Sequence, residues 1–146
     1  MSGLAALLAG HNAPGLYHWH SAAPVPDVQH AVEHAGWRFV YVDGWTVEDK
    51  QSFLKAAVQA LDVEDDRGTS FDALSDCLAE VDAPGRQGVV MLWDGWSPLA
   101  RHDEQAFRVA LSVLGGRCHA DRGCGFAALL RGDGPPLDLP ELPAKA

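Results

Sequence analysis

Acidic side chains gather in one stretch of this 146-residue sequence. Residues 62–82 contain eight Asp or Glu side chains and a single base, Arg67. Within the stretch, Asp72 and Asp76 stand four positions apart, so a helix would present both carboxylates on one face. Carboxylates form charge-assisted, often bidentate hydrogen bonds with basic side chains. We interpret the stretch as a binding surface for a cationic partner; an ordinary solvated helix face is the simpler alternative.

The charge of the whole chain favours the same kind of partner. The sequence has 20 acidic residues against 11 Lys and Arg, a formal net charge of −9 at pH 7. Such a protein repels nucleic acids and anionic membranes and attracts basic proteins. No apolar run approaches the ~18 residues of a membrane span, and residues 1–10 lack the basic segment of a secretory signal. We expect a cytoplasmic protein that binds neither nucleic acid nor membrane.

Histidines define the alternative chemistries. His30 and His34 are one helical turn apart with Glu33 between them, which resembles an inverted zincin motif in letters and gives a zinc-hydrolase alternative. His18 and His20 alternate along an extended segment and point the same way, a spacing that permits adventitious metal binding. An ordinary exposed helix face and an ordinary surface strand are the simpler interpretations of the two pairs.

The remaining reactive residues indicate no catalysis. Cys77, Cys118 and Cys124 are an odd number, which favours free thiols, although a bridge between the last two stays open. The sequence contains neither a nucleophile elbow nor a phosphate-binding loop. We therefore expect a binding protein and not an enzyme, with no catalytic residue, no cofactor and no metal.

Three apolar runs predict strands, at residues 37–42, 89–93 and 126–130. The helices that separate or precede them are expected to begin after four capping residues, Asp27, Thr46, Ser70 and Asp103. The last of these helices is expected to end at Gly115-Gly116. Strands that alternate with helices predict an α/β fold with a small three-stranded parallel sheet packed by helices.

The chain is expected to divide into three parts. Residues 1–36 are predicted to form a helical or extended N-terminal appendage, and residues 37–131 the α/β domain. Residues 132–146 are rich in proline and are predicted to form a loose tail without a contribution to the core.

Residues 68–78, with the sequence GTSFDALSDCL, resemble the signature of the barstar family. In that signature a glycine, two polar residues and an apolar residue precede Asp-Ala-Leu, and a second acid follows four positions after the first. The segments VDG at 42–44 and LWDGW at 92–96 are similar to other landmarks of the family. The resemblance covers residues 37–131, and the longer form with an Ala/Pro/His-rich leader is similar to barstar-related proteins of actinobacteria.

The resemblance implies inhibition of a small basic ribonuclease of the barnase type, or immunity to a ribonuclease toxin domain. It places the inhibitory surface on an acidic loop and the start of the following helix, where Asp72 and Asp76 match the two key acids. The residues that it assigns to partner binding are Asp65, Asp66, Arg67, Gly68, Thr69, Ser70, Asp72, Ala73, Asp76 and Glu80.

Three positions depart from the family pattern. Asp66 and Arg67 stand where the family usually has two aromatic residues, and Ser70 stands where it has asparagine. Aromatic side chains are frequent anchors of protein interfaces, so their loss removes packing area from the expected contact. The alternative function is therefore a barstar-fold binding protein whose partner is not a ribonuclease.

Overall fold

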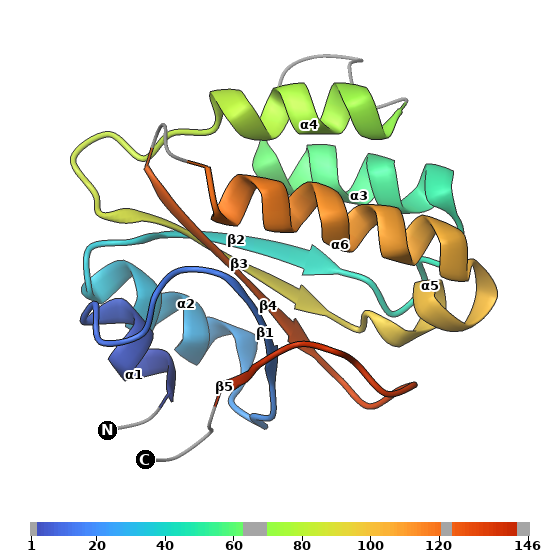
Figure 1. Cartoon of the computed structure of the whole chain (residues 1–146). Helices are drawn as coiled ribbons and strands as arrows, with labels where there is room; N and C mark the ends of the chain where they lie inside the picture. The colour runs from blue at the N-terminus through green and yellow to red at the C-terminus, as the bar shows by residue number, and fades with distance from the viewer. Residues whose placement is uncertain (1–2, 63–69, 121–123, 143–146) are drawn as a thin grey trace.

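The computed structural model describes residues 3–62, 70–120 and 124–142, which form α-helices and β-strands (Figure 1). In chain order the elements are α1 (Gly3–Leu8), β1 (Leu16–Trp19), α2 (Val25–His34), β2 (Arg38–Asp43), α3 (Lys50–Leu61), α4 (Phe71–Glu80), β3 (Gly88–Asp94), α5 (Ser97–His102), α6 (Glu104–Cys118), β4 (Gly125–Arg131) and β5 (Glu141–Leu142). In these described ranges no helix has the length and apolar character needed to cross a bilayer.

The strands form one parallel sheet in the order β2-β3-β4-β1-β5. The predicted strands correspond to β2, β3 and β4, but the prediction of a three-stranded sheet is wrong, because β1 and β5 extend it to five. β1 lies beside β4, with Leu16 opposite Ala128. β5 lies beside β1, with Leu142 opposite Trp19. A two-residue strand that follows a proline has too little pattern to be recognised in a sequence.

Helices cover both faces of the sheet, as predicted for an α/β fold. Figure 1 shows α3, α4 and α6 on one face and α1 and α2 on the other. All seven residues of β3, Gly88–Asp94, are buried. Such a strand needs apolar side chains on both faces, which explains its continuous apolar run.

Both segments that flank the predicted domain contribute to the core. Leu7 of α1 and Trp19 of β1 are buried, and the indole Nε1 of Trp37 donates a hydrogen bond to Leu8 O at 3.1 Å. Leu142 of β5 is only 1% exposed. The expectation that the tail adds nothing to the core is therefore wrong, whereas the division of the chain at residues 36 and 131 stays a prediction.

Three helix boundaries differ from those expected. α2 begins at Val25 and not after Asp27, which lies inside its first turn, because a proline is well tolerated in the first turn of a helix. α3 begins after Asp49 and not after Thr46, because Asp49 and Ser52 cap each other: the Asp49 carboxylate accepts from Ser52 N at 2.8 Å. α6 continues through Gly115-Gly116 as far as Cys118. The three cysteines are free thiols, as their odd number predicts.

Candidate functional site

Helix α4 carries the described part of the predicted site. The helix has an apolar side and a polar side, and these determine which way it faces on the molecule. The Ser70 side chain caps its start, where Oγ accepts a hydrogen bond from Ala73 N at 3.1 Å. Leu74, Cys77 and Leu78 are buried against the core. Because these apolar residues lie on one side of the helix, the opposite side must face the solvent.

The solvent-facing side of α4 is acidic. Asp72, Asp76 and Glu80 are exposed and repeat every four residues, so they lie along one side of the helix. Neither Asp72 nor Asp76 forms an ion pair within the part of the chain that the structure describes. Asp72 lies in the first turn, where the helix dipole stabilises a negative charge. Both carboxylates are therefore available to a partner.

The other predicted site residues divide into two groups. Ser70 and Ala73 are partly exposed at the start of α4, next to Asp72. Asp65, Asp66, Arg67, Gly68 and Thr69 lie outside the described residues. The structure thus brings together five of the ten predicted residues, and it leaves the assignment of all ten to partner binding as a prediction.

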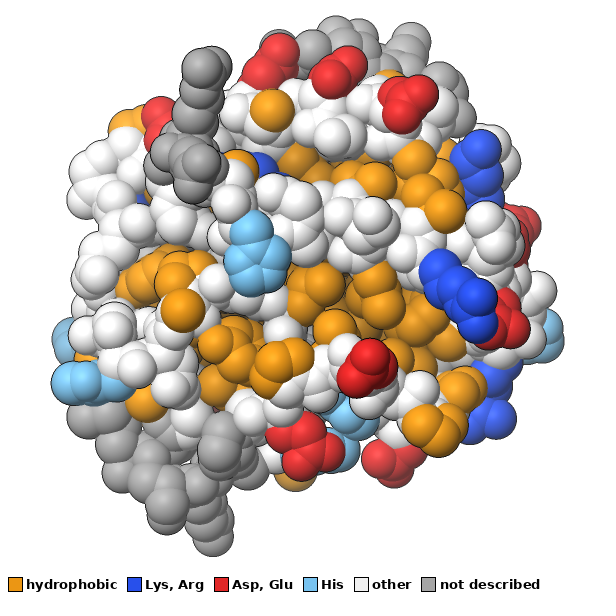
Figure 2. Space-filling view, in the orientation of Figure 1, with side chains coloured by type: hydrophobic (Ala, Val, Ile, Leu, Met, Phe, Trp, Pro, Cys, Tyr) orange, Lys and Arg blue, Asp and Glu red, His pale blue; other side chains and the backbone are white. Residues whose placement is uncertain are grey.

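A groove runs between α4 and α6 beside this acidic side. Its volume is about 770 Å³ and it is lined by Ser75, Leu78, Ala79, Ser112, Val113, Gly116, Arg117 and Ala120. Figure 2 shows acidic side chains along the α4 edge and hydrophobic side chains in the band between α4 and α6. Ser75 and Ala79 share the helical stripe of Asp72 and Asp76, so the carboxylates border the groove.

Sequence reasoning missed this groove because its walls are about forty residues apart in the chain. The α6 wall did leave a signal, since Ser112, Gly116 and Ala120 recur every four residues. Small side chains at that spacing project little from the helix, so they leave a shallow depression along one of its sides. Where α6 lies against α4, this depression leaves a groove between the two helices instead of a fully packed contact.

Arg117 of α6 holds the end of α4 in place. The guanidinium donates from Nε to Leu78 O at 2.8 Å and from Nη2 to Val81 O at 3.3 Å. Its carbon Cζ lies 5.3 Å from the centre of the Phe126 ring, and the residue is only 5% exposed. The last carbonyls of a helix carry partial negative charge, so this buried cation caps α4 from a neighbouring helix.

The start of α4 is held by aromatic contacts. The Phe71 ring lies 6.2 Å from the ring of Phe53, and Lys50 Nζ lies 5.7 Å from the Phe71 ring centre. A cation over an aromatic face is attracted to it. Both ends of α4 are therefore fixed, which presents Asp72 and Asp76 in a defined position.

The histidines of the zinc-hydrolase alternative lie on α2, on the other face of the sheet (Figure 1). The rings of His30 and His34 stack with their centres 5.7 Å apart. Among the residues that the structure places, no third His, Cys or carboxylate joins this pair within metal-binding distance. The alternative therefore gains no support from the geometry.

Comparisons with known proteins bear on the family and on the fold. The family model described as Barstar (barnase inhibitor) matches residues 37–131, the range over which the sequence resemblance was found. A search of curated protein sequences finds no significant match. Among solved structures, the fold is similar to that of the ORC2 protein of Aeropyrum pernix in ADPNP and ADP complexes, with a TM-score of 0.59.

The likeness to that protein concerns the fold alone. Sequence identity is 14%, and the match covers 90% of this chain but 38% of the other. The chain thus corresponds to little more than a third of that protein. The structural match supports the parallel α/β architecture, while the family match covers α4 and both strands that flank it.

Proposed function

We propose that this chain, which belongs to the barstar family of barnase inhibitors, binds and blocks the active site of a small basic ribonuclease. The target is a ribonuclease of the barnase type or a ribonuclease toxin domain, against which the chain would give immunity in the cytoplasm. On this proposal the protein has no catalytic activity of its own. Its binding surface consists of residues 65–70 and the exposed side of α4.

The observation that carries the proposal is the pair of exposed carboxylates on α4. Asp72 and Asp76 lie one turn apart without an ion-pair partner in the described structure. Side chains at this spacing have Cβ atoms about 5–6 Å apart. A ribonuclease active site holds cationic side chains arranged for phosphate groups. Two carboxylates held on one rigid helix can accept charge-assisted hydrogen bonds from those side chains in place of RNA phosphates.

The field of the whole protein supports the same partner. A net charge of −9 attracts a basic enzyme before contact. Electrostatic steering of this kind raises association rates by about 10- to 1,000-fold at low salt. The acidic stretch at 62–82 concentrates this charge at the proposed contact, so steering also favours the correct orientation.

The groove beside α4 gives the surface a shape as well as a charge. Its small side chains leave a volume of about 770 Å³ next to the carboxylates. A side chain from the partner can enter this space while its neighbours bind Asp72 and Asp76. Such a contact would add buried apolar area to the interface. It would compensate for the aromatic side chains that the family usually has at positions 66 and 67 and that this chain lacks.

One observation favours a partner other than a ribonuclease. Asp66 and Arg67 stand where the family usually has aromatic side chains, and aromatic residues are the usual interface anchors. Arg67 also brings a positive charge towards a basic enzyme. We therefore keep a barstar-fold binding protein with a different basic partner as the second candidate function.

Inhibition of RNA cleavage tests the proposal. The wild-type protein is titrated into a basic barnase-type ribonuclease, and the Asp72→Asn and Asp76→Asn variants are compared with it. Removing one side of a desolvated charge pair costs about 2–5 kcal/mol, so each variant should inhibit at least about 30-fold more weakly. Glu33→Gln serves as the control, because this exposed residue lies on α2 across the sheet.

The outcomes separate the two candidate functions. Inhibition by the wild type and the control, with loss in both α4 variants, supports a ribonuclease inhibitor that acts through α4. Inhibition that is unchanged in the α4 variants refutes the binding surface. If no barnase-type ribonuclease is inhibited, the second candidate function replaces the first.

A further inference from the structure

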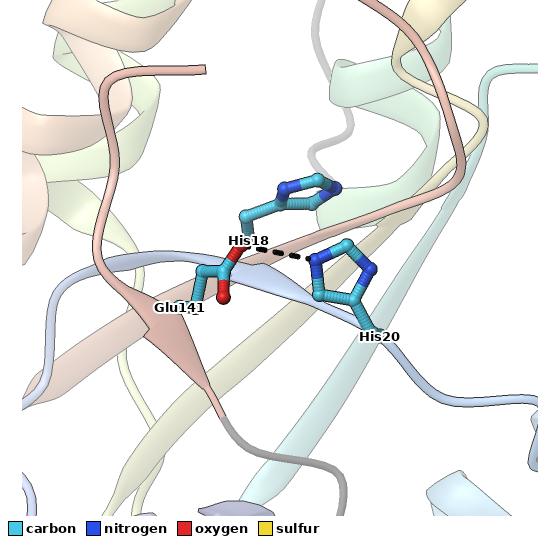
Figure 3. A group of neighbouring side chains, drawn as sticks. All are labelled: His18, His20 and Glu141. Atoms are coloured by element: carbon cyan, nitrogen blue, oxygen red, sulfur yellow. Dashed lines mark hydrogen bonds and ion pairs between the residues drawn. The ribbon is translucent and has the colours of Figure 1, made fainter. Parts of the chain in front are cut away.

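Two histidines and a glutamate meet at the edge of the sheet, on the junction of β1 and β5 (Figure 3). His18 lies on β1, His20 follows it by two residues, and Glu141 begins β5. One ligand atom from each side chain lies within 4.8 Å of the other two. None of the three belongs to the acidic side of α4, so this cluster is independent of the proposed function.

The sheet itself brings the three side chains together. Glu141 is the direct partner of His18 in the register of β5 on β1. Directly opposed residues on neighbouring strands project to the same face of the sheet, and the strands lie about 4.7–4.9 Å apart. Residues two apart along an extended segment also project to one face. The pairing of the strands therefore brings the three side chains together, so their proximity is not a chance contact of long, flexible side chains.

Neighbouring groups orient the His18 ring. Its Nε2 lies 3.1 Å from Gly132 O, and its ring meets the Trp96 ring edge-on with centres 5.6 Å apart. Because a carbonyl oxygen only accepts hydrogen bonds, Nε2 is the donor, and neutral His18 keeps its lone pair on Nδ1. Histidine ligands of metal ions have this support, in which one nitrogen donates to a carbonyl and the other binds the metal.

The distance between the other two residues fits a tetrahedral ion. His20 Nε2 lies 3.4 Å from Glu141 Oε1. Zinc binds nitrogen and oxygen at about 2.0–2.2 Å, so two ligand atoms at a tetrahedral angle are about 3.3–3.6 Å apart. The side chains of His20 and Glu141 are 51% and 70% exposed, which leaves them free to adjust towards a common ion.

We propose that His18, His20 and Glu141 bind one divalent transition-metal ion of the zinc class, which links β5 to β1. Two imidazole nitrogens and one carboxylate oxygen form a ligand set typical of zinc, and they leave the fourth position to water. The ion would hold a strand of only two residues, Glu141–Leu142, on the sheet. The sequence-based expectation of no metal rested on motifs within single segments, whereas this set joins residues 121 positions apart.

Zinc titration of the untagged full-length chain tests the proposal. Calorimetry with ZnCl2 should show one equivalent bound to the wild type. Glu141→Gln and His20→Gln change exposed side chains and should each weaken binding at least about tenfold, since losing even a supporting group costs about 10- to 100-fold. The matched control is the double variant His30→Gln/His34→Gln, which removes the other histidine pair of the chain and should bind zinc as the wild type does.

Amide hydrogen exchange then tests the link between the strands. Zinc should slow exchange in residues 16–19 and 141–142 of the wild type and leave exchange in Glu141→Gln unchanged. The site is refuted if the wild type binds no zinc, if the Glu141 and His20 variants bind as tightly as the wild type, or if the His30/His34 variant loses binding. Binding without slower exchange at β1 and β5 would refute the link.

Discussion

Replacing Arg117 by methionine should destabilise the protein and loosen the helix that carries the acidic surface. Arg117 is 5% exposed and donates to two carbonyls, Leu78 O and Val81 O. Methionine fills a similar volume but donates no hydrogen bond. Leu78 O keeps a second donor, Val81 N at 3.1 Å, so its loss is that of one net hydrogen bond, about 0.5–1.5 kcal/mol. Val81 O keeps only the weak Cys124 thiol at 3.8 Å, which makes its loss about 1–3 kcal/mol. Loss of the cation over the Phe126 ring adds about 1 kcal/mol.

Removing the buried positive charge of Arg117 offsets part of this loss of stability. In the described structure Arg117 has carbonyls, the Cys124 thiol and an aromatic ring around it but no carboxylate. Burying a cation costs several kcal/mol before its contacts are counted. We therefore expect Arg117→Met to lower the free energy of unfolding by about 3 kcal/mol, towards the lower end of the summed losses of about 2.5–5.5 kcal/mol.

Urea unfolding followed by circular dichroism measures this change, and thermal unfolding should show a decrease of roughly 6–12 °C for a chain of this size. Arg108→Met is the control: Arg108 lies on the same helix, is 71% exposed and, among the residues with described positions, pairs only with Glu104 one turn away. An exposed pair of this kind contributes about 0.5 kcal/mol or less. If the two variants lose equal stability, Arg117 does not anchor α4.

Three other changes test separate parts of the structure. Asp49→Ala should lower the urea midpoint at pH 7 and progressively less as the pH is taken below 3.8, because hydrogen bonds from Ser52 lower the pKa of the Asp49 carboxyl from that value. Stability from a lowered pKa is present at neutral pH and is lost as the pH falls through the folded-state pKa. The Cys118 thiol should react with iodoacetamide at pH 8 far more slowly in the folded protein than in urea, since burial raises its pKa to about 12; equal rates by mass spectrometry would contradict this. Gly116→Ala should stabilise the protein by about 0.5–1 kcal/mol, because a Cβ there meets nothing within 4 Å and alanine favours a helix interior. Gly44→Ala should destabilise it, because its Cβ would overlap the backbone carbonyl oxygen of Gly95. Urea unfolding compares the two variants.

The central strands could be predicted from the sequence because their burial leaves a local pattern. A strand that is buried on both faces must be apolar throughout, and β3 is apolar from Val89 to Trp93. β1 could be recognised only as an extended segment, since three partly buried residues followed by one buried residue give no clear alternation. β5 left no pattern, because its place depends on pairing with a strand more than a hundred residues earlier.

The acidic side of α4 was predictable in part, because some of its features also leave a local pattern in the sequence. The four-residue spacing of Asp72 and Asp76 and the capping Ser70 are local features, and the structure places them on one helix. The groove and the Arg117 anchor depend on the contact of α4 with α6. The groove left only the four-residue spacing of small residues on the α6 side, and the contact of Arg117 with α4 left no signal in the spacing of either helix.

The central claim is that the α4 carboxylates occupy the place of RNA phosphates, and a competition experiment tests it most directly. A fluorescent oligonucleotide that cannot be cleaved is bound to a basic barnase-type ribonuclease, and the wild-type protein is added while anisotropy is followed. We predict complete, competitive release of the oligonucleotide, and far weaker release by the variant Asp72→Asn/Asp76→Asn. A ternary complex, in which the protein binds and the oligonucleotide stays bound, would contradict the claim.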